Sequence, residues 1–335
     1  MSGTYKYASP RVIHWGTGSV SKLPSELDGL NVQRFALITT RSLVDSANRL
    51  GVEPATRSVV RQHAPHADID AAANHASDAK VDGIVSYGGG SAIDAAKIVS
   101  VRLGALPHIA VPTTLSVAEL AAGAGYTNEA GDKSGARDPR QLVSAVIYDA
   151  SLTLATPIQL WLSTGIRALD HAVEGFLADG EHPFNDVMAL EAIRRLFDSL
   201  PRAKEVPHDP DVRTENQLAA WFSFTLPEAS AAGLSHTMGK QIGARHGIPH
   251  GVTSCLLLPH VLRYLATRMP ARVAILSEVM GGDAAGCVQD LIRRLGLPQH
   301  IATYGIGEAE LRRAANDLAG KHSAEDLLQI YLSAL

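Results

Sequence analysis

Arg167 and His171 stand four residues apart in the stretch GIRALDHAVEGF, which spans residues 165–176. The pattern predicts a helix with one polar face, and this spacing places both side chains on that face, one turn apart. A histidine can bind a metal or move a proton, whereas a guanidinium stays charged and has no lone pair to offer a metal. The pair therefore indicates a polar site whose positive charge belongs either to an ion or to the arginine itself.

Two more histidines lie in the stretch SHTMGKQIGARHGIPHGVTSCLLLPH. His236 and His250 are fourteen residues apart there, and His250 stands between a proline and a glycine. A single histidine is usually an ordinary core or surface residue, but three from separate segments predict a convergent polar site in the second half of the chain. Lys240 and His246 lie in the same stretch and are further candidate catalytic residues, although His246 is expected on a solvated loop.

A glycine-rich turn follows an apolar run in SYGGGSAIDAAKIVS, residues 86–100. The run predicts a strand that ends at Gly88, Gly89 and Gly90, with a helix starting near Ser91. The free backbone N–H groups and the positive end of that helix would face a ligand over the turn, which is typical of a phosphate cradle. A plain tight turn is the alternative, and neither the dinucleotide fingerprint nor the phosphate-loop spacing is present.

A second polar loop follows the run HIAVPTT. Its hydroxyls belong to Thr113, Thr114 and Ser116, and it emerges at the carboxyl end of a predicted strand. Open α/β sheets bind ligands at that edge. The alternative is that the threonines only cap a helix.

The elements that position these residues fall into two halves. Compact apolar runs predict strands over residues 34–40, 81–91, 108–114 and 142–149, and amphipathic stretches between the first three predict a βαβ arrangement. After residue 155 the pattern becomes helical, for example in DVMALEAIRRLFDSL and AEDLLQIYLSAL. We therefore predict an α/β nucleotide-binding domain over residues 1–155 and an all-helical catalytic domain over residues 156–335.

Composition limits the partners. The chain has 335 residues, a net charge of −4 and 46% hydrophobic residues, which suits a soluble globular protein. Scattered lysines and arginines form no basic stripe, so no nucleic-acid partner is expected. No leader-like segment and no run of eighteen apolar residues is found, so we expect a cytoplasmic protein without membrane insertion. The two cysteines, Cys255 and Cys287, are too few for a disulfide framework.

Several motifs in one order resemble the iron-containing alcohol dehydrogenase superfamily, which shares its fold with dehydroquinate synthase, and within it the maleylacetate reductases. The matching segments are PRVIHWGTGSVSKL, GGGSAIDAAK, VPTT, KSGARDPRQLVSAVIYDASLT, GIRALDHAVEG and HGIPHGVTSCLLLPHVLRY. The resemblance implies an N-terminal domain that binds NADH or NADPH and an all-helical C-terminal domain. It also implies hydride transfer to a carbonyl in the cleft between the domains, and a homodimer.

The resemblance also assigns cofactor residues. It places Gly88, Gly89, Gly90 and Ser91 at the pyrophosphate, Thr113, Thr114 and Ser116 along the nicotinamide half, and Lys133 near a ribose. NAD-preferring relatives often carry an acidic residue after the first Rossmann-like strand, but this chain reads ITTRSL there. Thr40 and Arg41 are suited to a 2′-phosphate, so the choice between NADH and NADPH stays open.

In the metal-dependent branch, an Asp four residues before the helical His joins three histidines around one divalent ion. Here His171, His236 and His250 occupy the histidine positions, but Arg167 replaces the Asp. A guanidinium 4 Å from a dication would repel it by roughly 8 kcal/mol at an effective dielectric of about 20. We therefore predict no metal requirement, which the maleylacetate reductases also imply; if a metal does bind, those three histidines are its ligands.

Arg167 would then supply the positive charge, either by polarising the carbonyl or by pairing with a substrate carboxylate. The alternative is that it is anchored to Glu174 or Asp170, although Asp170 is expected to point away from the site. His250 or His236 is the expected proton donor, and Lys240 replaces a further family histidine. Two rival functions are a metal-dependent alcohol or aldehyde dehydrogenase and a non-redox or internally redox-cycling, lyase-like enzyme.

Overall fold

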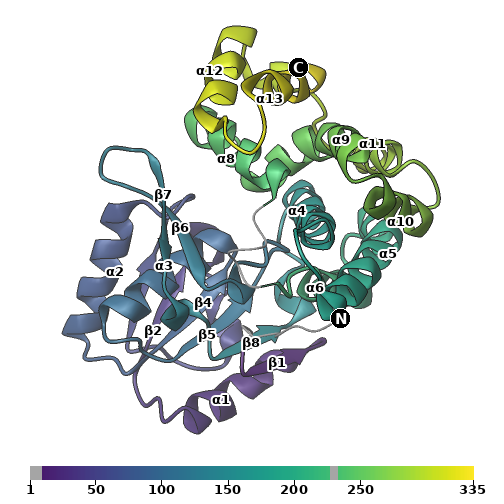
Figure 1. The fold of residues 1–335 in the computed structure, drawn as a ribbon. Coiled ribbons are helices and arrows are strands. Elements are labelled where there is room, and N and C mark those ends of the chain that lie inside the picture. Colours follow the sequence, from purple (N-terminus) through teal and green to yellow (C-terminus); the bar gives the residue numbers. More distant parts are fainter. Residues whose placement is uncertain (1–9, 227–232) are drawn as a thin grey trace. The chain divides into compact units, whose positions relative to one another are not determined.

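The computed structural model describes residues 10–226 and 233–335, and these form two compact units (Figure 1). The first unit holds residues 10–156 together with 208–218. The second unit holds residues 157–207 and the described residues from 219 to 335. The short segment 208–218 therefore groups with the first unit although it follows part of the second in the sequence.

A six-stranded parallel sheet forms the centre of the first unit, in the order β1-β8-β5-β4-β2-β3. All four strands predicted from the sequence are present. The bounds are β1 Val12–Trp15, β2 Phe35–Thr39, β3 Thr56–Val59, β4 Gly83–Gly88, β5 His108–Pro112 and β8 Ala145–Tyr148. Sequence reasoning missed β1 and β3, which are four-residue strands at the two edges of the sheet, and the antiparallel pair β6 Gly123–Thr127 and β7 Lys133–Arg137.

Both faces of this sheet are covered, as a parallel sheet requires. Along β2 the side chains alternate: Phe35 and Leu37 enter one core, and Ala36 and Ile38 enter the other. Helices α2 (His66–Asp78) and α3 (Gly90–Arg102) cover the second face, and Figure 1 shows them beside the strands. Helix α1 (Leu23–Gly29) packs on the first face.

The second unit is helical, as the sequence predicted. Its helices are α4 Ile158–Phe176, α5 Pro183–Glu205, α8 Leu234–His246, α9 His250–Arg268, α10 Pro270–Met280, α11 Ala284–Leu295, α12 Glu308–Leu318 and α13 Ala324–Ser333. Helix α6 (Pro210–Phe222) runs from one unit into the other. None of the described helices is long and apolar enough to span a membrane.

Helix α4 is the central helix of the second unit. Every residue from Trp161 to Phe176 is buried, because α5 and α9 pack against it. The sequence predicted one polar face, and the structure adds that this face is buried as well. Charged side chains on such a face need partners inside the protein.

Candidate functional site

Neighbouring side chains pack tightly against the glycine turn after β4. Gly88 has φ +157°, and a β-carbon there would lie 2.9 Å from Cβ of Ala92. At Gly89 the β-carbon would lie 2.9 Å from Cγ2 of Thr114. Helix α3 begins at Gly90, one residue before the predicted start, so its first backbone N–H groups stand at the turn without helical acceptors. The turn is therefore a narrow cradle that admits only glycine and exposes amide donors.

The loops after β2 and β5 lie beside this cradle because both strands pair with β4. Thr40 approaches the Gly88 position from one side, with Cγ2 3.8 Å from where a β-carbon would stand, and Arg41 follows it as an exposed residue. On the other side, the Thr113 amide donates to the Gly88 carbonyl at 3.0 Å. The Oγ atoms of Thr114 and Ser116 are buried and have no hydrogen-bond partner in the described part of the chain.

Two buried hydroxyls without partners beside a glycine cradle fit a dinucleotide, because buried polar atoms are normally hydrogen-bonded. The structure brings together the predicted residues Thr40, Gly88–Ser91, Thr114 and Ser116 at one edge of the sheet. Ser91 has a further role, since its Oγ accepts from the His63 amide at 2.9 Å.

Lys133 lies at the start of β7, close to Asp94 and Gly125. The Gly125 amide donates to Asp94 Oδ2 at 3.0 Å. Burial lowers the pKa of Lys133, and the Asp94 carboxylate opposes that shift. Lys133 and Asp94 therefore both lie near Gly125, and Asp94 belongs to α3, the helix that follows the glycine turn.

Sequence reasoning missed Lys97, a fully buried residue of α3. Its Nζ donates to the carbonyl oxygens of Ala121 and Gly123, both at 2.8 Å, and also to that of Ala118. The segment it holds begins directly after Val117, which has φ +54°, a strained value for a β-branched residue. The available signal was a lysine on the apolar face of a predicted helix.

Arg167 lies at the centre of the second polar cluster, with 6% of its surface exposed. Its Nη2 donates to Nε2 of His236 at 2.7 Å, and its Nη1 donates to Oγ of Ser254 at 3.1 Å. These contacts join α4 to the first turn of α8 and to α9. The predicted residues Arg167, His171 and His236 therefore come together.

The expectation that Asp170 points away is wrong. Asp170 Oδ2 lies 3.6 Å from Arg167 Nη1 and accepts from Ser254 at 2.6 Å and from Ser235 at 3.0 Å. The reason is helical geometry: residues three apart, like those four apart, are neighbours on a helix surface. Arg167 is thus anchored to Asp170, which was one of the alternatives considered from the sequence.

Glu174 hydrogen-bonds to the start of α8, whereas Asp170 is the acidic neighbour of Arg167. Its carboxylate accepts from the backbone amides of Ser235 and His236 at the start of α8. Gly233 precedes that helix, and a β-carbon there would lie 2.3 Å from Cδ of Glu174. Burial, together with the neighbouring Asp170, raises the pKa of Glu174 well above its ordinary value. Arg167 and the two backbone amides act in the opposite direction without cancelling this shift. Glu174 therefore fixes the backbone that carries His236.

His171 and His236 are neighbours, with ring centroids 5.1 Å apart. Burial, and then the charge of Arg167, lower the pKa of each imidazole well below its ordinary value. Because Arg167 can only donate, Nε2 of His236 accepts, and the neutral ring carries its proton on Nδ1. Burial and the guanidinium therefore disfavour an imidazolium at His236, which argues against the role of proton donor predicted for this residue.

The cluster does not fit the divalent metal that the metal-dependent enzymes of the resembling superfamily bind. Nε2 of His236, a lone pair that a metal would need, accepts a hydrogen bond from a cation. Within the described ranges, no group of three His, Cys, Asp or Glu side chains is arranged to hold a metal. The donor set has a guanidinium where a fourth ligand would be needed, so no metal is assigned to these residues.

His250 and Lys240 lie on the helices that complete this cluster. His250 is the first residue of α9, and the next residue, Gly251, packs so closely on α4 that a β-carbon would lie 2.6 Å from the Ser163 carbonyl oxygen. Lys240 is exposed on α8, and its charge contributes to lowering the pKa of His171 and of His236. Both residues are therefore placed with α4 and α8 in the second unit.

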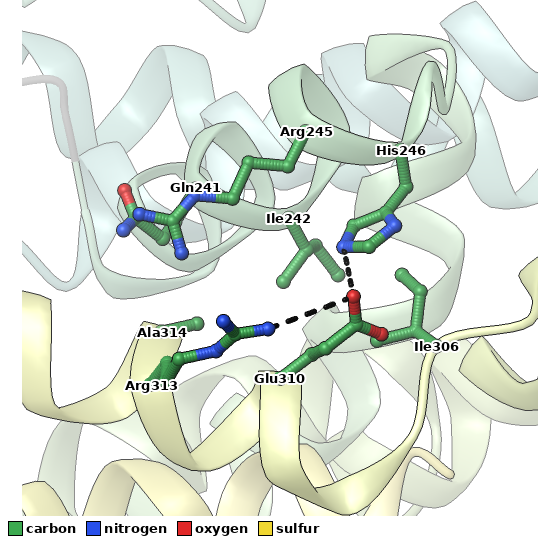
Figure 2. Close-up of a pocket in the computed structure, with 8 residues that line it drawn as sticks. All are labelled: Gln241, Ile242, Arg245, His246, Ile306, Glu310, Arg313 and Ala314. Carbon is green, nitrogen blue, oxygen red and sulfur yellow. Dashed lines mark ion pairs between the residues drawn. The ribbon is translucent and has the colours of Figure 1, made fainter.

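His246 lies apart from this cluster and on a helix, whereas a solvated loop was expected from the sequence. It is the last residue of α8, about 15 Å along the helix from His236, given the rise per residue. Figure 2 shows it in a separate pocket of about 160 Å³, with its Nε2 3.9 Å from Oε1 of Glu310. The other lining residues are Gln241, Ile242, Arg245, Ile306, Arg313 and Ala314. His246 is therefore not a member of the Arg167 cluster.

The family is shown by two matches that together cover most of the chain. Residues 10–150 match the model described as iron-containing alcohol dehydrogenase, and residues 161–326 match its Fe-containing alcohol dehydrogenase C-terminal counterpart. The chain belongs to the iron-containing alcohol dehydrogenase family. It is an NAD(P)-dependent oxidoreductase, and the relatives that it matches include maleylacetate reductases.

Individual relatives agree with this assignment. Maleylacetate reductase from Pseudomonas sp. strain P51 is 32% identical over 91% of this chain and 88% of its own length. The crystal structure of maleylacetate reductase from Agrobacterium tumefaciens has a TM-score of 0.90 and 28% identity, covering 100% of this chain and 99% of its own. Sulfoacetaldehyde reductase from Bifidobacterium kashiwanohense, solved in complex with NAD+, has a TM-score of 0.87 and 25% identity, covering 99% of both chains.

Proposed function

We propose that this protein reduces the carbonyl or enone of a carboxylate-bearing substrate of the maleylacetate type with NADH or NADPH and without a metal ion. The observation that carries the proposal is the 2.7 Å hydrogen bond from Arg167 to Nε2 of His236, which sets a fixed cation among the histidines. Similarity to maleylacetate reductases supports the substrate class.

NADH or NADPH would supply the hydride when bound at the glycine cradle. The amide groups at Gly88–Ser91 bind its pyrophosphate, and the hydroxyls of Thr113, Thr114 and Ser116 bind its nicotinamide half. Lys133, which lies near Asp94 and Gly125, would bind a ribose. Thr40 and Arg41, with no acidic residue beside them, accept either a ribose hydroxyl or a 2′-phosphate.

Arg167 binds the substrate carboxylate. Two of its five N–H groups have acceptors among the described residues, on His236 and Ser254, and the planar guanidinium retains further donors that match a carboxylate. Asp170 balances part of the charge, so the cation is kept inside the protein without a bound anion. The positive charge also stabilises negative charge that develops on the carbonyl oxygen during reduction.

The product alkoxide needs a proton, and the neutral rings of His171 and His236 do not provide an imidazolium. We assign the donor role to His250, the remaining histidine of the set, which starts α9 next to the tight contact with α4. Lys240 is the second candidate, because its charge acts on the same two histidines.

An assay of NADH and NADPH oxidation with maleylacetate, before and after exhaustive chelation, tests the proposal. We expect turnover that chelation leaves unchanged, with less than about one metal ion per ten chains by elemental analysis. Turnover lost on chelation and restored by iron or zinc would mean that the histidines hold a metal after all. Nucleotide that binds without net oxidation would favour an internally redox-cycling enzyme.

A further inference from the structure

Asp170, Ser254 and Arg167 form a buried chain of polar contacts that ends at His236. Asp170 and Ser254 each expose only 1% of their surface. The Ser254 hydroxyl donates to Asp170 Oδ2 at 2.6 Å and accepts from Arg167 Nη1 at 3.1 Å. One hydroxyl therefore connects the carboxylate to the guanidinium, and its single proton fits both contacts.

The contacts fix the direction of the guanidinium as well as its charge. An arginine side chain has many rotamers, and a buried one is held only where several N–H groups have acceptors. Nη1 is held by Ser254, with Asp170 3.6 Å away, so the plane of the guanidinium is set on that side. Nη2 is then directed at His236.

Asp170 also reaches α8 through Ser235, which donates to the same Oδ2 at 3.0 Å. Ser235 precedes His236, so the carboxylate holds both the arginine and the segment that carries its histidine acceptor. Three helices, α4, α8 and α9, thereby converge on one oxygen atom.

We propose that Asp170 and Ser254 are positioning residues for the reduction, which fix the Arg167 guanidinium in the orientation that binds the substrate carboxylate and donates to Nε2 of His236. This inference rests on the proposed function. Asp170 and Ser254 act through Arg167 and do not themselves touch the substrate.

The test is Ser254→Ala, with Ser163→Ala as the matched control. Ser163 is a buried serine whose hydroxyl donates only to the Leu160 carbonyl of its own helix, at 3.1 Å, among the described contacts. We expect Ser254→Ala to raise the KM for maleylacetate about 10-fold, the effect of one lost hydrogen bond to a charged group, with an unchanged Kd for the nucleotide. The control should change KM less than 2-fold.

A background carrying both Arg167→Ala and Asp170→Asn separates positioning from stability. There, Ser254→Ala should change KM less than 2-fold, because the group it positions is absent. A 10-fold effect in both backgrounds would overturn the inference, and so would an unchanged KM in the otherwise wild-type chain.

A readout without substrate distinguishes failure of this inference from failure of the proposed function. In protein with ¹⁵N-labelled histidine, we expect the His236 signals, assigned with His236→Gln, to show a proton on Nδ1 in the wild type and a shifted Nε2 signal in Ser254→Ala. Identical His236 signals in Ser254→Ala and Ser163→Ala would overturn the positioning role. A wild-type protein that oxidises no nucleotide with maleylacetate would overturn the proposed function alone.

Discussion

At the scale of single residues, side-chain chemistry and helical spacing predicted much of the Arg167 cluster. The four-residue spacing placed Arg167 and His171 on one face, and the structure agrees. The same rule, applied to a three-residue spacing, would have placed Asp170 there too. The serines that complete the cluster could not be foreseen, because Ser235 and Ser254 come from segments that only packing brings together.

Arg167→Ala is the first residue-scale prediction. Loss of the carboxylate partner should raise the KM for maleylacetate between about 10-fold and 100-fold, the range for hydrogen bonds to charged groups, and leave the nucleotide Kd unchanged. Steady-state kinetics and nucleotide fluorescence titration measure the two quantities. Arg167→Lys should give an intermediate KM, since it keeps the charge and loses the fork.

An unchanged KM in folded Arg167→Ala protein would refute substrate pairing. Because the substitution leaves Asp170 buried without its counter-charge, the double variant Arg167→Ala with Asp170→Asn provides the control for stability.

At the scale of elements, compact apolar runs predicted the central strands. The edge strands β1 and β3 have only four residues each, and β3 is also polar, so neither gives that signal. The turn after β4 was predicted as a cradle, and its glycines are needed mainly against Ala92 and Thr114. His246 is the opposite case, because its segment was predicted as a loop. In the structure it is the last residue of α8, and Gly247 caps the C-terminal end of that helix.

The contact between α4 and α9 supports an element-scale prediction. Gly251→Ala would put a β-carbon 2.6 Å from the Ser163 carbonyl oxygen and 2.9 Å from the Thr164 amide nitrogen, both backbone atoms. We expect a loss of about 1–3 kcal/mol in stability, seen as a Tm several degrees lower, because the two helices must separate.

Gly29→Ala, at the end of α1, is the control for that substitution because a β-carbon there meets nothing within 4 Å. Its stability should change by less than about 0.5 kcal/mol. Equal Tm values for the Gly251 and Gly29 variants would show that the α4 and α9 backbones are not in close contact.

At the scale of the whole molecule, buried neutral histidines make stability depend on pH. His108, at the start of β5, is buried and hydrogen-bonded to Ser86 at 2.8 Å. Burial, followed by the charge of Lys97, lowers the pKa of His108 to about 3. The unfolded chain binds this proton near pH 6.5 and the folded chain does not, so the stability is complete above that pH and falls progressively toward pH 3.

When the pH is lowered from 7 to 5, the low pKa of His108 should reduce the free energy of unfolding by about 2 kcal/mol. Urea unfolding of the wild type and of His108→Gln at both pH values measures the effect. The glutamine variant should lose about 2 kcal/mol less than the wild type over that interval. Parallel losses in the two proteins would show that His108 is protonated in the folded state.

Because of Lys97, the loop after β5 does not depend on dissolved ions. Three carbonyl oxygens form a cage around one positive centre, the Lys97 ammonium group, which is covalently tethered to α3. The cage is therefore filled as soon as the chain folds, and its occupancy does not vary with the salts in solution. The segment that follows the strained turn at Val117 is therefore held by a cation that the chain itself carries, and it needs no ion from solution.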